Sequence, residues 1–222
     1  ATYIAAIESG VHIVDTALSS MSGLTSQPSM NALIAALRGH ARETKLTNRD
    51  MQPLADYWEG VREFYTPFEC GLKSSTSEVY YHEIPGGQYS NLRPQVASLG
   101  LIDRWPDVRD AFAVVNKLVG DIPKVTPSSK MVGDFAIFLV QNDLLEMRGD
   151  LSSSVEATRQ KLLMESKRLD FPQSVVTYFQ GHLGKPPGGF PADLGPAVLK
   201  GEPVLSGRPS DGMEPFDFEA AK

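Results

Sequence analysis

Val11-His12-Ile13-Val14-Asp15-Thr16-Ala17 is the stretch that decides the predicted fold class, because four of its seven residues are β-branched. A short apolar run of this composition is typical of a buried strand. The residues before it, 1–7, favour a helix that ends at Gly10, and Pro28 opens a further predicted helix. A helix followed by a buried strand is characteristic of an α/β unit with a parallel sheet.

A single strand cannot form a sheet, so we expect the rest of this sheet to lie outside the chain. The first residue, Ala1, falls inside a predicted helix, without a cap or turn before it. Both observations predict that the chain is a piece of a longer protein and that the part before Ala1 belongs to the same domain.

The remainder of the sequence is predicted to be mostly helical. Apolar residues recur at helical spacing in two stretches, a third stretch is strongly apolar and of helix length, and Ser152 to Ser154 are candidate caps for a further helix. A short strand is possible at 79–82, and the Pro- and Gly-rich tail from Lys185 is predicted to be irregular. The predicted helices cover residues 51–65, 105–119, 131–140, 152–167 and 172–180.

Composition excludes several classes of protein. Hydrophobic residues make up 41% of the 222 residues, charged residues make up 22%, and the net charge is −6. No basic stripe indicates nucleic-acid binding, and no apolar run approaches the ~20 residues that span a bilayer. The one cysteine, Cys70, cannot form an internal disulfide, which fits a reducing compartment. We therefore expect a cytoplasmic protein, or one of the mitochondrial matrix if the source is eukaryotic.

No metal or nucleotide motif is complete in the sequence. The histidines lack the spacing of metal ligands on one element, so each is interpreted as structural and no metal ligand is assigned. Neither a Walker loop nor a G-x-S-x-G elbow occurs. The histidines are His12, His40, His82 and His182.

Three segments carry candidate chemistry, and each also has a structural interpretation. The loop at 20–28 is a turn before a helix, or a substrate-contacting loop at the end of a strand. Ile84-Pro85-Gly86-Gly87-Gln88 is a turn, or a close backbone approach to a ligand. In Lys124-Val125-Thr126-Pro127-Ser128-Ser129-Lys130, Thr126 is a helix N-cap, or part of a helix N-terminus that binds a carboxylate with help from Lys130.

Taken together, these segments resemble the pyruvate carboxylases in order and spacing. The resemblance covers nearly the whole chain and continues through Phe171-Pro172-Gln173-Ser174-Val175 and Leu183-Gly184-Lys185-Pro186-Pro187-Gly188-Gly189-Phe190-Pro191. It implies the C-terminal part of a (β/α)8 TIM barrel followed by a mostly helical funnel extension. Residues 1–40 would hold the last strand and helices of the barrel, 41–205 the funnel, and 206–222 a connector toward the next domain. The stretch 149–168 is longer than the family pattern, and its charged helix is expected on the surface.

The resemblance also implies a biotin-dependent carboxylase that transfers a carboxyl group from carboxybiotin to pyruvate, giving oxaloacetate. Thr126 would relay a proton, and Gln88, Ser129 and Lys130 would line the biotin pocket. A divalent metal such as Zn or Mn would be held by residues outside this chain. The implied partners are pyruvate, the biotin carboxyl carrier domain and the rest of the barrel, in a homo-tetramer.

Two alternatives stay open at this point. The chain resembles, less closely, other biotin-dependent carboxyltransferases such as oxaloacetate decarboxylase or transcarboxylase subunits. As an isolated piece it is expected to be inactive and is equally consistent with a non-catalytic assembly fragment.

Overall fold

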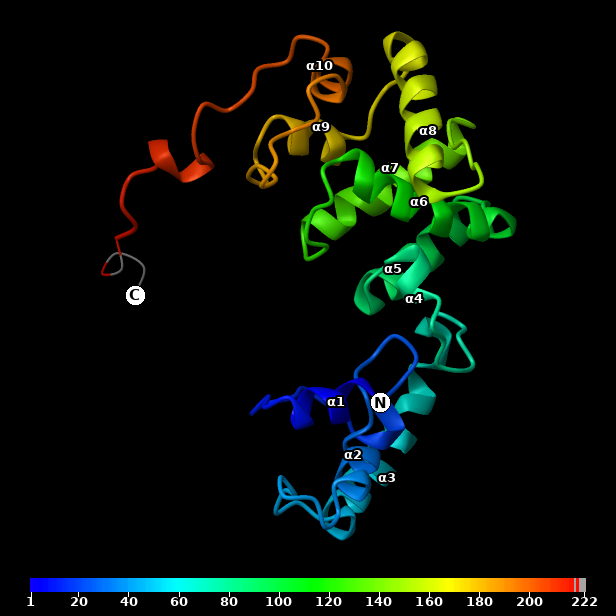
Figure 1. The fold of residues 1–222 in the computed structure, drawn as a ribbon, viewed down its shortest axis with the longest axis vertical. Coiled ribbons are helices and arrows are strands. Elements are labelled where there is room, and N and C mark those ends of the chain that lie inside the picture. Colours follow the sequence, from blue (N-terminus) through cyan, green and yellow to red (C-terminus); the bar gives the residue numbers. More distant parts are fainter. Residues whose placement is uncertain (218, 220–222) are drawn as a thin grey trace. The chain divides into compact units, whose positions relative to one another are not determined.

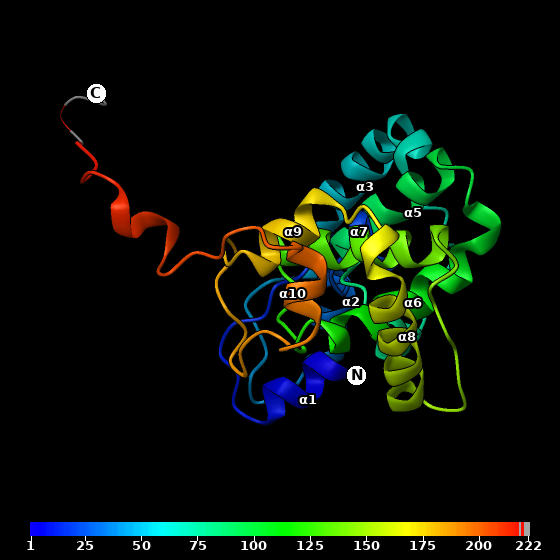
Figure 2. The same ribbon diagram turned by 90° about the horizontal axis from the view of Figure 1, so that it is seen from above.

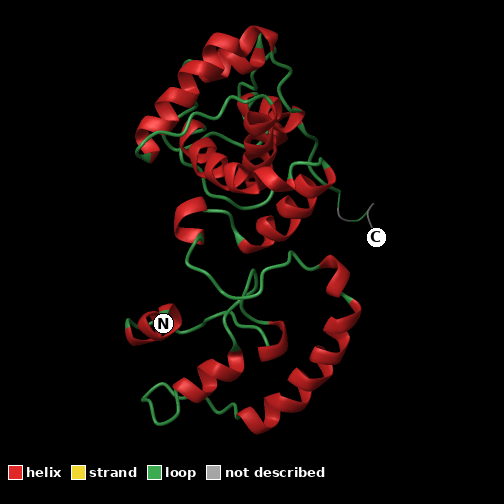
Figure 3. Cartoon of the chain, turned by 90° about the vertical axis from the view of Figure 1, so that its right-hand side faces the viewer, coloured by secondary structure: helices red, strands yellow, loops and turns green. Residues whose placement is uncertain are grey.

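The computed structural model describes residues 1–217 and 219, and these residues form helices joined by loops (Figures 1 and 3). They contain no strand. Contacts divide the chain into two compact units. The N-terminal unit comprises Ala1–Ser77 and Tyr89–Gln95, and the C-terminal unit comprises Glu78–Gln88 and the residues from Val96 onward. The predicted domain boundaries at residues 40 and 205 stay a prediction.

Two helices of the N-terminal unit start at side-chain caps. The Ser29 hydroxyl accepts a hydrogen bond from Ala32 N–H (3.2 Å), and the Thr47 hydroxyl accepts one from Asp50 N–H (3.2 Å). The longest helix, α3, packs against α2 and against the 3-10 turn η1, which lies in the loop after the predicted strand. The elements are α1 (Thr2–Glu8), η1 (Ser19–Met21), α2 (Met30–Ala36), α3 (Asn48–Phe64) and η2 (Thr66–Phe68).

The predicted strand at 11–17 is wrong for the described chain. Only Ala17 makes a bridge, an isolated parallel one to Ser29. The Ile13 side chain is 83% exposed, although the composition of this stretch suits a buried position. A strand is stabilised by hydrogen bonds to a neighbouring strand, and the described residues offer none to 11–16.

The possible strand at 79–82 is also wrong, since these residues form the short helix α4 (Val79–His82). His82 N–H donates to the carbonyl of Glu78 (3.0 Å), which closes one helical turn. The turn packs against α6 (Trp105–Leu118), and this packing overrides the strand propensity of Val and Tyr. Glu83 then ends α4 with a positive φ of 58°.

The core of the C-terminal unit is the pair α6 and α7 (Ser128–Gln141), which pack along each other (Figure 1). Helical spacing predicted α6, and a strongly apolar stretch of helix length predicted α7. Phe112 on α6 and Phe135 on α7 have no exposed surface. α7 is apolar around most of its circumference, as expected for a helix covered on several sides.

One further helix packs against α7 of this pair, and another packs against that helix. α9 (Gln173–Phe179) packs against α7, and α10 (Leu194–Leu199) lies beside α9 (Figure 2). α10 lies in the tail that was predicted to be irregular, and the Asp193 carboxylate caps it by accepting from Leu194 N–H (2.9 Å). α5 (Gly86–Ser98) starts at the two glycines that were read as a turn.

α8 (Leu151–Glu165) lies at the surface, as expected, but one of its faces is buried. It packs against α6, and Ser154, Thr158 and Leu162 form a buried stripe at four-residue spacing. Its N-cap is Asp150, which accepts from Ser153 N–H (2.9 Å), so the predicted caps at Ser152 to Ser154 are wrong.

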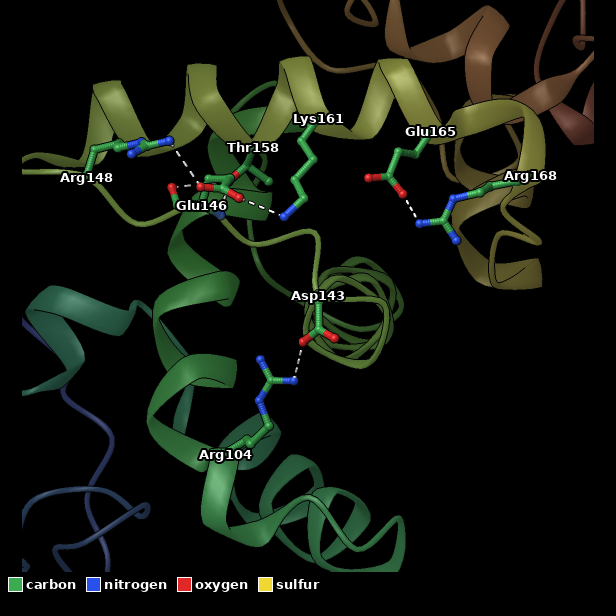
Figure 4. A network of polar contacts seen from close by, with 8 residues as sticks. All are labelled: Arg104, Asp143, Glu146, Arg148, Thr158, Lys161, Glu165 and Arg168. Carbon is green, nitrogen blue, oxygen red and sulfur yellow. Dashed lines mark hydrogen bonds and ion pairs between the residues drawn. The ribbon is translucent and has the colours of Figure 1, made fainter.

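The buried hydroxyls of α8 bind the backbone of the loop after α7, and Figure 4 shows the one from Thr158. Thr158 Oγ1 accepts from Glu146 N–H (3.0 Å), and Ser154 Oγ accepts from Arg148 N–H (2.8 Å). The Glu146 carboxylate pairs with Lys161 of α8 (2.7 Å), and this hydrogen bond is the main cause that lowers the Glu146 pKa. α8 therefore holds this loop in position through hydrogen bonds and an ion pair.

Arg104 fixes the other end of the same loop (Figure 4). Its guanidinium pairs with Asp143 (2.8 Å) and donates to the carbonyl of Val140 (2.7 Å). The last turn of α8 is closed by an ion pair between Arg168 and Glu165.

No helix among the described residues is long and apolar enough to cross a membrane.

Replacing Thr158 with Val should release the loop after α7. Val has the same shape but cannot accept from Glu146 N–H, and an unpaired buried donor costs about 1–3 kcal/mol. Hydrogen–deuterium exchange of the 144–150 peptide should speed up about tenfold. The control Thr177→Val removes only an exposed bond to Gln173 and should leave that peptide unchanged. Equal exchange in both variants would contradict the account.

Candidate active site

A pocket of about 410 Å³ in the C-terminal unit contains Thr126 in its wall. One side is the loop between α6 and α7, and the other is the segment 183–187 together with Tyr178 of α9. Two of the segments that carried the predicted chemistry and resemblance therefore meet here. We call this the Thr126 pocket; it is lined by Ile122, Pro123, Val125, Thr126, Pro127, Ser128, Tyr178, Leu183, Gly184, Lys185, Pro186 and Pro187.

Thr126 is exposed, and its hydroxyl does not cap α7. The helix begins at Ser128 with Pro127 as N-cap, so the predicted cap at Thr126 is wrong. The Ser128 hydroxyl bonds the loop backbone instead, because it lies 2.6 Å from the carbonyl oxygens of both Pro123 and Val125. Among the described residues, no side-chain partner holds the Thr126 hydroxyl, which leaves it available to a ligand.

The opposite wall approaches closely because of Gly120, which has a φ of 105°. A Cβ at this position would lie 3.3 Å from Pro186, so a side chain would push the segment 183–187 away. Tyr178 fixes the floor, since its buried hydroxyl donates to the carbonyl of Val119 (2.6 Å). Burial raises the pKa of Tyr178, which therefore stays protonated.

Two other predicted site residues, Ser129 and Lys130, follow Thr126 in sequence, whereas Gln88 lies earlier in the chain; none of the three lines the pocket. Ser129 is buried in the first turn of α7. Lys130 is exposed and pairs with Asp134 (2.6 Å), which also accepts from the Ser174 hydroxyl of α9 (2.7 Å). Gln88 is half-buried in the first turn of α5. Their roles toward biotin stay predictions.

A polar network joins the segment before Gln88 to the segment before Thr126. Glu83 pairs with Lys124 (2.7 Å), and the Asn116 amide donates to Glu83 (3.3 Å). Asn116 has no exposed surface. Sequence reasoning missed this network, although Asn116 stands in an apolar run of α6 and a buried amide requires a partner.

The predicted loop at 20–28 lines a different cavity, of about 440 Å³, in the N-terminal unit. Its aromatic lining includes Trp58 of α3 and Tyr65, the residue that follows this helix. Arg62 holds the loop by donating to the carbonyl of Ser20 (2.7 Å) and pairing with Glu69 (2.6 Å). The side-chain hydrogen bond with Arg62 lowers the pKa of Glu69.

Metal ligands do not cluster in the described part of the chain, where no three His, Cys, Asp or Glu side chains are placed to hold an ion. His82 is buried, and its Nδ1 accepts from Ile84 N–H (2.9 Å). Burial lowers the pKa of His82, which favours the neutral ring and agrees with a structural role.

The family model described as "Conserved carboxylase domain" matches residues 79–222. This range contains the Thr126 pocket, the Glu83–Lys124 pair and Gln88. The chain belongs to this family of conserved carboxylase domains.

Within this family, the chain corresponds to part of the carboxyltransferase domain of the pyruvate carboxylases. Pyruvate carboxylase of Staphylococcus aureus is 48% identical over 221 residues, which are 100% of this chain and 18% of that protein. The carboxyl transferase domain of Rhizobium etli pyruvate carboxylase has a TM-score of 0.86 at 42% identity, covering 99% of this chain and 35% of that one. The same domain with pyruvate and biocytin has a TM-score of 0.86 at 41% identity, with the same coverage of 99% and 35%. The chain thus spans about a fifth of the length of the curated relatives.

Replacing Tyr178 with Phe should destabilise the floor of the Thr126 pocket. The carbonyl of Val119 would lose its buried donor, at a cost of about 1–3 kcal/mol. Thermal unfolding should occur several degrees lower than in wild type. The wild-type protein should also lose stability above pH ~10, because the unfolded tyrosine releases a proton that the folded one keeps.

The matched control is Tyr81→Phe, because Tyr81 is exposed. Its unfolding temperature should stay within about 1 °C of wild type. An equal decrease in both variants would mean that the hydroxyl of Tyr178 does not hold the pocket floor.

Proposed function

We propose that this chain forms part of the site at which a pyruvate carboxylase transfers a carboxyl group from carboxybiotin to pyruvate, giving oxaloacetate. The observation that carries the proposal is the free hydroxyl of Thr126 in the wall of a pocket, within the range matched by the carboxylase family. The similar Rhizobium etli domain is described with pyruvate and biocytin, a pair of ligands that fits this reaction.

In the proposed reaction the carboxyl group moves from biotin to pyruvate, and a proton must move in the opposite direction. The methyl carbon of pyruvate loses a proton as its new bond to the carboxyl carbon forms, and the nitrogen that released the carboxyl group needs one. A hydroxyl donates and accepts at once, so the Thr126 side chain is chemically suited to pass this proton. Biotin, when bound, supplies the carboxyl carrier. The chemistry of Thr126 fits this role, because its hydroxyl is not used for capping α7.

The remaining predicted residues are proposed to bind biotin. Gln88 would contribute an amide donor and acceptor, Ser129 a hydroxyl, and Lys130 a positive charge. Lys130 would act together with Asp134, since the two side chains are paired. A divalent metal is proposed for the complete domain, but the described residues form no cluster that fits one. We therefore derive no step through the metal from this chain.

The remainder of the carboxyltransferase domain is the proposed partner of the N-terminal unit. The stretch 11–16 has no regular secondary structure but a strand-like composition, and its Ile13 is exposed. This fits a (β/α)8 barrel whose other strands lie elsewhere in the longer protein, as the 35% coverage of the Rhizobium etli domain allows. The carrier domain and a homo-tetrameric assembly are proposed on the same resemblance.

In the full-length protein, Thr126→Ala should lower oxaloacetate formation about 10²- to 10⁴-fold, the usual contribution of a positioned acid–base group. Thr126→Ser should retain part of the rate, because it restores the hydroxyl. ATP-dependent carboxylation of biotin, assayed separately, should be unchanged in both variants.

The matched stability control is Ser128→Ala, which removes the hydroxyl that bonds the loop backbone. This variant should melt lower, whereas Thr126→Ala should not. Near-normal turnover in Thr126→Ala would show that its hydroxyl is not part of the chemistry.

Gln88→Ala should slow carboxyl transfer to pyruvate about tenfold, because one hydrogen bond to a ligand contributes ~1 kcal/mol. Carboxylation of biotin from ATP and bicarbonate should be spared. Gln141→Ala, an exposed amide at the end of α7, serves as the control and should affect neither half-reaction. Equal losses of both half-reactions in Gln88→Ala would indicate misfolding instead of a binding role.

A further inference from the structure

The Asn116 amide lies between two carboxylates inside the C-terminal unit. Its Nδ2 is 2.9 Å from Asp121 Oδ1 and 3.3 Å from Glu83 Oε2. This orientation is required, because the reverse would place the amide oxygen against two negative charges. Asn116 Oδ1 has no hydrogen-bond partner among the described residues, and the two charge-assisted bonds from Nδ2 offset the cost of burying it.

Both carboxylates belong to residues with an unusual backbone. Glu83 has a φ of 58° and Asp121 a φ of 55°, in the left-handed region that L-residues seldom occupy. Each therefore carries local strain that surrounding contacts must hold. Asn116 contacts both, and the Asp121 N–H also donates to the Asn116 carbonyl (2.8 Å).

Lys124 extends the network to the Thr126 loop. Its ammonium is 2.7 Å from Glu83 Oε2, and the two side chains are only 19% and 28% exposed. Lys124 precedes Thr126 by two residues, and Glu83 precedes Gln88 by five. A single carboxylate thus joins the start of α5 to the loop that presents Thr126.

We propose that Glu83 is a positioning residue for carboxyl transfer: with Asn116 and Lys124, it holds the Gln88 segment and the Thr126 loop in one fixed arrangement. This inference rests on the proposed function and names a residue that acts through Thr126, without itself contacting the ligand. If these residues served the stability of the unit alone, packing between its helices would be sufficient. A half-buried ion pair supported by a buried amide restricts both loops in direction as well as distance.

The test is Glu83→Gln in the full-length protein, compared with Glu146→Gln. Both changes keep the size of the side chain and remove the charge from a Lys pair at 2.7 Å, and the Glu146 pair with Lys161 is similarly half-buried, at 29% and 29% exposure. Glu83→Gln should lower kcat for pyruvate carboxylation about 10- to 100-fold, as a displaced reacting group does. The KM values for ATP and bicarbonate, and the rate of biotin carboxylation, should stay within about twofold. Glu146→Gln should leave all of these unchanged.

Two further variants separate positioning from folding. Lys124→Met should lower the rate of pyruvate carboxylation. Lys124→Arg should retain most of that rate, because Arg can still pair with Glu83. Glu83→Gln should have a smaller effect in a Thr126→Ser background than in wild type, since residues that act through one another are not additive.

The inference is overturned if Glu83→Gln behaves like Glu146→Gln, if both half-reactions fall together, or if the Glu83 and Thr126 effects multiply. These results are distinct from failure of the proposed function. That failure would appear in the wild-type protein, as an absence of pyruvate carboxylation, or in Thr126→Ala, as a normal rate.

Discussion

The C-terminal unit depends on one buried amide, that of Asn116, which stands between the carboxylates of Glu83 and Asp121. A buried amide without partners would destabilise the unit, whereas one bound to two charges specifies where both must lie. Through Glu83 the same contact reaches Lys124. The ends of α4 and α6 and the loop that carries Thr126 are consequently set by a single cluster of polar side chains.

Apolar packing supplies the rigid support for this cluster. α6 and α7 bury almost all of their facing side chains, and α8 and α9 cover them from outside. The loop between α6 and α7 is short and held at several points, by Ser128, by Lys124 and by the bond from Tyr178 to Val119. Thr126 is therefore exposed on a well-supported loop with its hydroxyl uncommitted, an arrangement that suits contact with a ligand.

The parts of the fold that depend on local pattern could be predicted from the sequence. α6 was predicted from apolar spacing, because one helix face buried against another leaves a periodic signal, and α7 was predicted from a strongly apolar stretch of helix length. The strand at 11–17 failed because strands are stabilised by partners, and the described residues provide none for 11–16. Thr126 was identified by its motif, but its capping role was wrong, since Ser128 makes the local bonds. The Asn116 network joins residues 33 positions apart, and no local pattern encodes such a contact.

We propose that the loop held by Glu83 presents Thr126 to the reacting ligand. The most direct measurement is a crystal structure of the full-length protein with pyruvate and biocytin, in which the distance from Thr126 Oγ1 to the ligands is read. The account predicts a ligand polar atom within about 3.5 Å of Thr126 Oγ1, with the Glu83–Lys124 pair intact. Ligands bound with Thr126 turned away, or with that pair broken, would contradict it.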